Sequence, residues 1–97
     1  MKKHLIVANW KCNPENKKEA LRLFDSVKKN TIKVKNTEVV ICPPFVYLSL
    51  LSGLTLGAQN VFFKEKGAFT GEISPLMLKD LKVKYVILGH SEVRGYL

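Results

Sequence analysis

The order in which short apolar runs and helical segments follow one another constrains the fold of this chain most. Four β-rich runs are separated by three segments with helix signals, and no linker or low-complexity stretch interrupts them. The runs lack the polar–apolar alternation of a half-exposed strand, so they are typical of parallel strands buried on both faces. They cover residues 4–9, 38–42, 54–59 and 85–89. The resulting β-α-β-α-β-α-β order predicts a parallel sheet with right-handed crossovers.

Local residue types set the expected ends of the first helix. Asn13-Pro14 supplies an N-cap and a first-turn proline. Lys28 and Lys29 close the helix, where positive charge suits the negative end of the helix dipole. One face of this helix is expected to pack on the sheet. That face carries Ala20, Leu23, Phe24 and Val27.

The two later helices have similar signals. Pro43-Pro44 stops the second run before a short apolar helix that continues through Leu51, and Gly53 ends that helix. Ser74-Pro75 then caps a third helix over residues 76–81.

Composition excludes several classes of protein. A chain of 97 residues that is 46% hydrophobic and 25% charged fits one small globular domain and argues against disorder. Its apolar stretches are too short to span a membrane, and Leu5 to Ala8 is too short for the apolar part of a signal peptide. We therefore expect a cytoplasmic protein without a membrane partner. Cys12 and Cys42 lack metal-ligand or redox spacing, which predicts two reduced thiols and no metal site.

The formal net charge of +8 raises the possibility of nucleic-acid binding. The lysines, however, are dispersed along the predicted helices and loops, where a solvated face explains them. Neither zinc-finger spacing, an RNP-type aromatic motif nor an arginine-rich run accompanies them. We expect no nucleic-acid partner, and the same positive field would attract anionic metabolites.

The residues that follow each run are where chemistry is expected. A barrel segment and a doubly wound sheet give the same pattern, and in both of them ligands bind at the carboxyl ends of the strands. The absence of a G-x-G-x-x-G or P-loop motif weakens the nucleotide-binding versions of the second architecture. The four exits carry Asn9-Trp10-Lys11, Cys42-Pro43-Pro44, Gln59-Asn60 and His90-Ser91-Glu92.

Five short motifs in order resemble those of the triosephosphate isomerase family. They are Ala8-Asn9-Trp10-Lys11-Cys12-Asn13, Ile41-Cys42-Pro43-Pro44, Ala58-Gln59-Asn60, Gly67-Ala68-Phe69-Thr70-Gly71-Glu72-Ile73-Ser74 and Gly89-His90-Ser91-Glu92. The resemblance covers essentially the whole chain. It implies an α/β fold, the N-terminal β-α-β-α-β-α-β portion of a (β/α)8 TIM barrel. Residues 1–97 would then be the N-terminal part of a single barrel domain that is incomplete at the C-terminus.

The resemblance also implies an activity and roles for three residues. The family interconverts dihydroxyacetone phosphate and D-glyceraldehyde 3-phosphate through an enediolate, in glycolysis and gluconeogenesis, without a cofactor. His90 matches the electrophile that polarises the substrate carbonyl, although a lone histidine is more often structural than catalytic. Lys11 matches the substrate-binding lysine, and its cation would attract the phosphate and the developing enediolate. Asn9 matches a residue that helps to hold the substrate and Lys11. On their own, the lysine and the asparagine would be read as a surface charge and a turn residue.

Supporting and interface roles follow from the same resemblance. Glu92 is expected to pair with Lys11 rather than to serve as the base, and Ser91 to steady the site or merely to cap a helix. In the family, the loop from Val61 to Ser74 enters a neighbouring subunit, so a homodimer is implied, with Thr70 at the partner's site.

The sequence departs from the family pattern at two places. The family usually has two arginines after the glutamate, but here the residues are Val93 and Arg94. This puts in doubt an interface contact that could involve Glu72. The segment from Phe45 to Gly57 is also shorter than usual, which implies a trimmed second helix.

A complete barrel of this type takes about 250 residues. The expected proton-moving carboxylate, closing lid and phosphate loops would lie beyond Leu97, so these 97 residues alone are predicted to be inactive. Two alternatives remain open: a non-enzymatic half-barrel module that self-assembles through its open strand edges, and a basic polyanion-binding protein.

Overall fold

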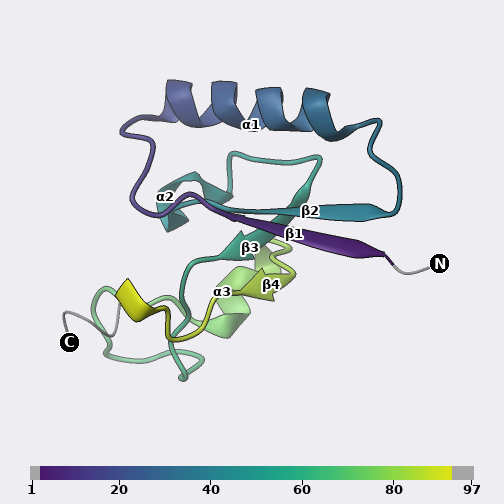
Figure 1. Ribbon diagram of the computed structural model, residues 1–97. Coiled ribbons are helices and arrows are strands. Elements are labelled where there is room, and N and C mark those ends of the chain that lie inside the picture. The colour runs from purple at the N-terminus through teal and green to yellow at the C-terminus, as the bar shows by residue number, and fades with distance from the viewer. Residues whose placement is uncertain (1–2, 93–97) are drawn as a thin grey trace.

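The chain forms one parallel sheet with helices packed on its outer side (Figure 1). The computed structural model describes residues 3–92. The strands are β1 (His4–Asn9), β2 (Thr37–Cys42), β3 (Thr55–Ala58) and β4 (Tyr85–Val86). The helices are α1 (Lys17–Thr31), α2 (Phe45–Leu48) and α3 (Pro75–Asp80). The strands follow one another as β1-β2-β3-β4 with every pair parallel, which confirms the predicted order.

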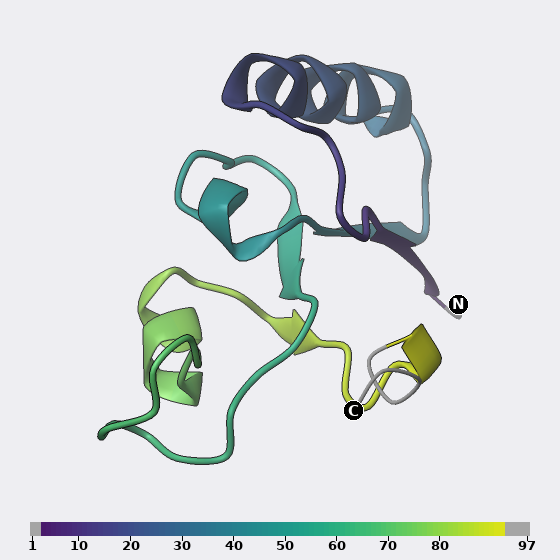
Figure 2. The ribbon, with the colours of Figure 1, turned by 90° about the vertical axis from the view of Figure 1, so that its left-hand side faces the viewer.

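The sheet is curled like half of a barrel. Figure 2 shows α1, α2 and α3 on its convex side, while the turn after β4 lies on the concave side. In Figure 1 the chain leaves all four strands at the left-hand edge, where the connecting loops gather. The predicted fold class, the N-terminal portion of a (β/α)8 barrel, is therefore confirmed. The geometry also brings the strand exits together.

The core lies between the sheet and its helices. Ala20 and Phe24 of α1 are buried, and Leu23 and Val27 are half-buried beside them, so the predicted helical face is confirmed. Burial of a side chain such as Phe24 contributes about 1.5–3 kcal/mol. The remaining buried members of this cluster are Ile41, Tyr47, Leu48, Leu51, Leu56, Ala58 and Leu78.

The first helix begins later than the sequence predicted. Its N-cap is Asn16, whose side chain accepts a hydrogen bond of 2.9 Å from the backbone nitrogen of Glu19. Asn13 instead donates to the carbonyl of Trp10 at 3.2 Å, within the loop that leaves β1. Both asparagines suit a cap, but only Asn16 has an acidic residue three positions later, near the positive end of the helix dipole.

The second helix is shorter than predicted. α2 ends at Leu48 rather than Leu51, and backbone bonds from Leu50 to Tyr47 and from Leu51 to Leu48 continue the chain as tight turns. Gly53 therefore does not end the helix. Its φ of +104°, which favours glycine, turns the chain into β3. The expected cap of α3 is confirmed, because the Ser74 hydroxyl accepts a hydrogen bond from the nitrogen of Met77.

The two outer strands differ from the expectation of strands buried on both faces. In β1, Leu5, Ile6 and Val7 are about half exposed, at 50%, 54% and 46%. β4 was expected over residues 85–89 but covers only Tyr85–Val86, followed by one further bond from Ile87 to Ala58. Each of these strands has one neighbour among the described residues, so its other edge and one face lack packing. Val40, Ile41 and Cys42 of the inner strand β2 are fully buried.

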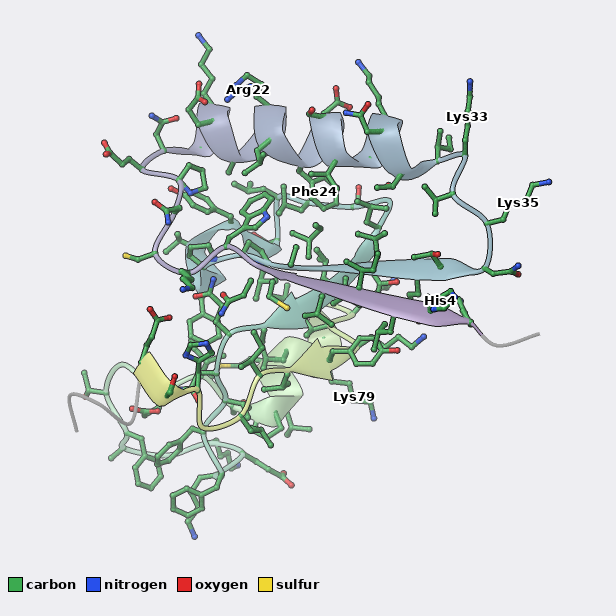
Figure 3. The ribbon with its side chains drawn as sticks, viewed as in Figure 1. His4, Arg22, Phe24, Lys33, Lys35 and Lys79 are labelled. Atoms are coloured by element: carbon green, nitrogen blue, oxygen red, sulfur yellow. The ribbon has the colours of Figure 1, made fainter. Side chains whose placement is uncertain are left out.

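Basic side chains project outward from the fold. Figure 3 shows Arg22, Lys33 and Lys35 pointing away from the sheet, while Phe24 points toward it. Among residues 3–92, none of the helices is long and apolar enough to cross a membrane.

Candidate active site at the strand exits

The exit of β1 is a left-handed turn at Lys11. The φ of Lys11 is +57°, a conformation that costs about 1 kcal/mol or more for a residue other than glycine. Two amide side chains hold it. The backbone nitrogen of Lys11 donates to Asn9 Oδ1 at 2.9 Å, and the backbone oxygen of Lys11 accepts from Gln59 Nε2 at 2.7 Å.

The exit of β4 presents His90 with a defined ring orientation. Its Nδ1 accepts a hydrogen bond of 3.1 Å from the backbone nitrogen of Glu92. Because an imidazole nitrogen that accepts carries no proton, the neutral ring has its hydrogen on Nε2. Glu92 Oε1 also lies 3.5 Å from Nδ1, a contact that would favour a protonated ring. The shorter bond from the amide makes the neutral tautomer the better description.

Lys11 and Glu92 connect the two exits. Lys11 Nζ lies 3.5 Å from Glu92 Oε2, and both side chains are about half exposed, at 56% and 55%. Ion pairs this exposed contribute about 0–1 kcal/mol, so this pair orients Lys11 only weakly. The histidine side chain is 32% exposed, so it remains open to a ligand.

Ser91 and Glu92 have helical backbone conformation directly after His90, and both are exposed. His90 thus precedes the start of a helical turn.

The exit of β2 contributes a backbone carbonyl rather than a side chain. The oxygen of Cys42 accepts hydrogen bonds from Trp10 N at 3.0 Å and from Gln59 Nε2 at 2.9 Å.

Burial raises the pKa of the Cys42 thiol, so this thiol stays protonated at neutral pH. Cys12 is exposed, and both cysteines are free.

The long loop after β3 carries Thr70 at its outer end. The loop is closed by a bond from Phe62 N to Ile73 O and by a turn in which Glu72 N donates to Phe69 O. Gly71, with a φ of +87°, occupies the position of this turn that favours glycine. Thr70 is exposed and, among the described residues, forms no hydrogen bond with Asn9, Lys11 or His90.

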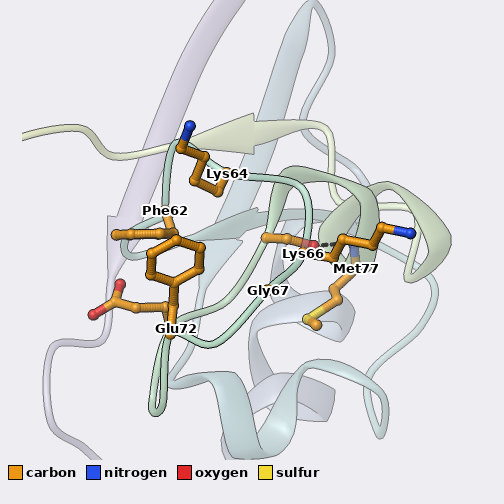
Figure 4. A pocket seen from close by; sticks show the side chains of 8 residues that line it. Phe62, Lys64, Lys66, Gly67, Glu72 and Met77 are labelled. Carbon is orange, nitrogen blue, oxygen red and sulfur yellow. Dashed lines mark hydrogen bonds between the residues drawn. The ribbon is translucent and has the colours of Figure 1, made fainter.

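A pocket of about 40 Å³ lies inside this loop (Figure 4). Its lining includes Phe62, Lys64, Glu72 and Met77, and Asn9, Lys11 and His90 do not contribute. The pocket is therefore part of the loop and not of the strand-exit site.

The same loop carries three aromatic side chains. Phe62 stacks against Phe69 with ring centroids 4.7 Å apart, and Phe63 is 76% exposed.

The sequence departs from the family pattern at the pair Val93 and Arg94. These residues lie outside the described part of the chain, and so does any contact that they make with Glu72. Within residues 3–92, no group of three or more histidine, cysteine or acidic side chains could hold a metal ion.

Gln59 belongs to one of the sequence motifs, but no role was predicted for it. Its position directly after a strand is the sequence feature that could have indicated a role at the site.

Known proteins show clear sequence similarity to this chain. The family model described as triosephosphate isomerase matches residues 4–97. Relatives named triosephosphate isomerase include proteins of Dehalococcoides mccartyi (strain ATCC BAA-2100 / JCM 16839 / KCTC 5957 / BAV1), 48% identical, and of Alkaliphilus oremlandii, 50% identical. A relative from Clostridium tetani is 44% identical.

These matches cover 99% of this chain, but the chain spans only 39–40% of the length of the relatives. Each alignment is 102 positions long against a chain of 97 residues, so at least five positions of each relative face no residue here. A shortened segment, as predicted between Phe45 and Gly57, would produce such a gap. On the family match and these identities, the chain belongs to the triosephosphate isomerase family.

Proposed function

We propose that this chain supplies the electrophilic and phosphate-binding half of a triosephosphate isomerase active site. The observation that carries the proposal is the approach of two oriented donors from the exits of the two outer strands, β1 and β4. His90 has its Nδ1 occupied by the amide of Glu92, and Lys11 Nζ lies 3.5 Å from Glu92 Oε2. Glu92 thus contacts both side chains.

The chemistry follows from these two groups. The ammonium of Lys11 attracts the phosphate dianion of dihydroxyacetone phosphate or D-glyceraldehyde 3-phosphate, and it also stabilises negative charge on the substrate oxygen. The Nε2–H of His90 donates a hydrogen bond to the carbonyl oxygen as the enediolate forms. Asn9 holds the turn at Lys11 and contributes to substrate binding.

Glu92 acts in support of Lys11 rather than as the proton-moving base. Both of its oxygens lie toward the other two groups, at 3.5 Å from Lys11 Nζ and 3.5 Å from His90 Nδ1. A base must reach the carbon-bound proton of the substrate, whereas this carboxylate is engaged with the cation. Another carboxylate, outside these 97 residues, moves the proton, and the 97 residues alone are inactive. Ser91 plays a minor supporting part.

The cellular setting is also part of the proposal. The complete enzyme works in glycolysis and gluconeogenesis, in the cytoplasm, without a cofactor. It is a homodimer in which Thr70, at the exposed end of its loop, reaches the partner's site. The exposed Phe63 in this loop supports such a contact, because exposed aromatic groups are favoured at interfaces.

The test uses a complete barrel, meaning these 97 residues joined to the remaining part of the Dehalococcoides mccartyi relative. Lys11→Met should raise KM and lower kcat, because the charge acts both before and in the transition state. Lys79→Met, on an outward-facing lysine of α3, is the matched control and should leave both constants unchanged. If Lys11→Met has the same KM and kcat as its parent, the assigned role of Lys11 is wrong.

A second candidate function, a self-assembling half-barrel module, has one observation in its favour. Leu5, Ile6 and Val7 of β1 and Leu88 after β4 are 46–71% exposed, so both edges of the sheet offer apolar surface. Catalysis by the complete barrel, with a loss on Lys11→Met, would favour the enzyme over this module.

A further inference from the structure

We propose that Gln59 is a positioning residue that holds Lys11 in its left-handed turn and thereby fixes the substrate-binding cation. The inference rests on the proposed role of Lys11. It starts from the amide of Gln59, which comes from the exit of β3 and donates to two backbone oxygens of other strand exits. These are Lys11 O at 2.7 Å and Cys42 O at 2.9 Å.

The turn at Lys11 needs external support. A lysine at a φ of +57° is strained, and such a conformation persists only where the surroundings over-determine it. Asn9 satisfies the backbone nitrogen of Lys11, and Gln59 satisfies the backbone oxygen. With both polar groups of one residue held by side chains, the plane of each flanking peptide is fixed, and with it the direction of the Lys11 side chain.

The second bond of Gln59 ties this turn to the rigid part of the sheet. Cys42 is fully buried, and its oxygen also accepts from Trp10 N at 3.0 Å. A residue buried in the inner strand β2 moves little, so it provides a fixed reference for the amide of Gln59. The exits of β1, β2 and β3 are thus joined at one point.

Other contacts of Lys11 do not replace this support. Its ion pair with Glu92 is 3.5 Å long, and both side chains are about half exposed. Pairs of this kind are weak and screened by salt. The backbone therefore mainly determines the Cα–Cβ direction from which the ammonium extends, and displacement of a binding group by about 1 Å can cost on the order of 10²-fold in rate.

The experiment compares variants of the complete barrel. Gln59→Met keeps the size of the side chain but removes the donor. We expect it to raise KM, lower kcat and reduce kcat/KM by about 10-fold to 100-fold. Thr55→Val is the matched control, because it removes a hydrogen bond at the opposite end of the same strand, from Thr55 Oγ1 to Glu38 Oε2. It should lower the melting temperature and leave kcat/KM unchanged.

A double-mutant cycle separates positioning from general stability. If Gln59 acts through Lys11, Gln59→Met should cause no further loss of kcat/KM in a Lys11→Met background. Independent, multiplicative losses would overturn the proposal while leaving the role of Lys11 intact. If Lys11→Met alone has no effect, the proposed function fails first, so the two failures are distinguishable.

A second variant keeps the test open if Gln59→Met does not fold. In Gln59→Glu, an ionised carboxylate repels the two backbone oxygens, whereas a protonated one can donate to one of them. The activity relative to the parent at the same pH should therefore rise as the pH falls toward about 5. A ratio that is independent of pH would contradict a role for the donor.

Discussion

His90 Nδ1 lies 3.1 Å from the backbone nitrogen of Glu92, which donates a hydrogen bond to it. This one contact fixes the tautomer of the ring and leaves Nε2–H as its only donor. Because the donor is a backbone amide, it is present whatever the protonation state of the neighbouring carboxylates. A histidine held in this way is suited to donate to a substrate oxygen rather than to remove a proton.

Replacing His90 should therefore impair turnover. In the complete barrel, we expect His90→Ala to reduce kcat by roughly 10²-fold or more, the scale for loss of one preorganised oxyanion donor. Steady-state kinetics in both directions would measure it. His4→Ala, on an exposed residue at the start of β1, is the control and should match the parent. A His90→Ala variant within a few-fold of the parent would exclude the electrophile role.

The 97-residue polypeptide alone should show no isomerase turnover. Neither of its two site groups can move the proton, because Lys11 is a cation and His90 donates through Nε2. A coupled assay on the purified polypeptide would measure this. Glu92→Gln is the informative companion, since turnover that is lost in this variant would identify Glu92 as a base after all.

Glu38 should make stability depend on pH. Its side chain, only 13% exposed, accepts hydrogen bonds from Lys84 Nζ at 3.1 Å, Thr55 Oγ1 at 3.0 Å and Tyr85 hydroxyl at 3.1 Å. The bond from Lys84, followed by that from Thr55, holds the pKa of Glu38 below its usual value, and these bonds outweigh the effect of burial. This carboxylate thus connects β2 with β3 and β4.

Because the folded pKa is the lower one, the stabilisation is complete above the unfolded pKa and is lost as the pH falls through the folded value. We expect Glu38→Gln to lower the melting temperature of the complete barrel above about pH 5. The difference from the parent should shrink in more acidic solution. Glu19→Gln is the control, since Glu19 has a lowered pKa through its bond with Arg22 but is more exposed and should change stability little. A difference that grows in acid would contradict this account.

The isolated 97-residue polypeptide should associate or pack loosely. Ile6 is 54% exposed and Leu88 71% exposed, and both outer strands have unpaired edges among the described residues. Sedimentation should detect oligomers, or amide exchange should show weak protection, while the charge of +8 slows precipitation. Ile6→Lys should reduce association. A compact, well-protected monomer at micromolar concentration would rule out this expectation.

The sequence by itself predicted the order of the elements and the residues that follow each strand. Strand β1 begins and ends where the apolar run does, Ser74 caps α3 as its neighbour Pro75 suggested, and the residues at the four exits carry the family motifs. These features depend on residues a few positions apart, so periodicity and capping chemistry are sufficient to find them.

Local sequence signals did not predict the start of α1, where two asparagines could serve as the cap, or the end of β4, which depends on its neighbouring strand. Asn13 and Asn16 both suit a helix cap, and the loop contacts of Asn13 with Trp10 leave the cap to Asn16. β4 ends at Val86 because its only neighbour among residues 3–92, β3, ends at Ala58. Strand length depends on the partner, which a single run does not reveal.

Only the tertiary structure decided how the site is held. Gln59 is 48 residues from Lys11 in the sequence, yet its amide bonds to the oxygen of Lys11. Glu92 is 81 residues from Lys11, and the curl of the sheet brings their charges to 3.5 Å. Contacts between residues so far apart depend on strand order and register. Their geometry is set only when the whole sheet forms, because no local pattern of residues carries it.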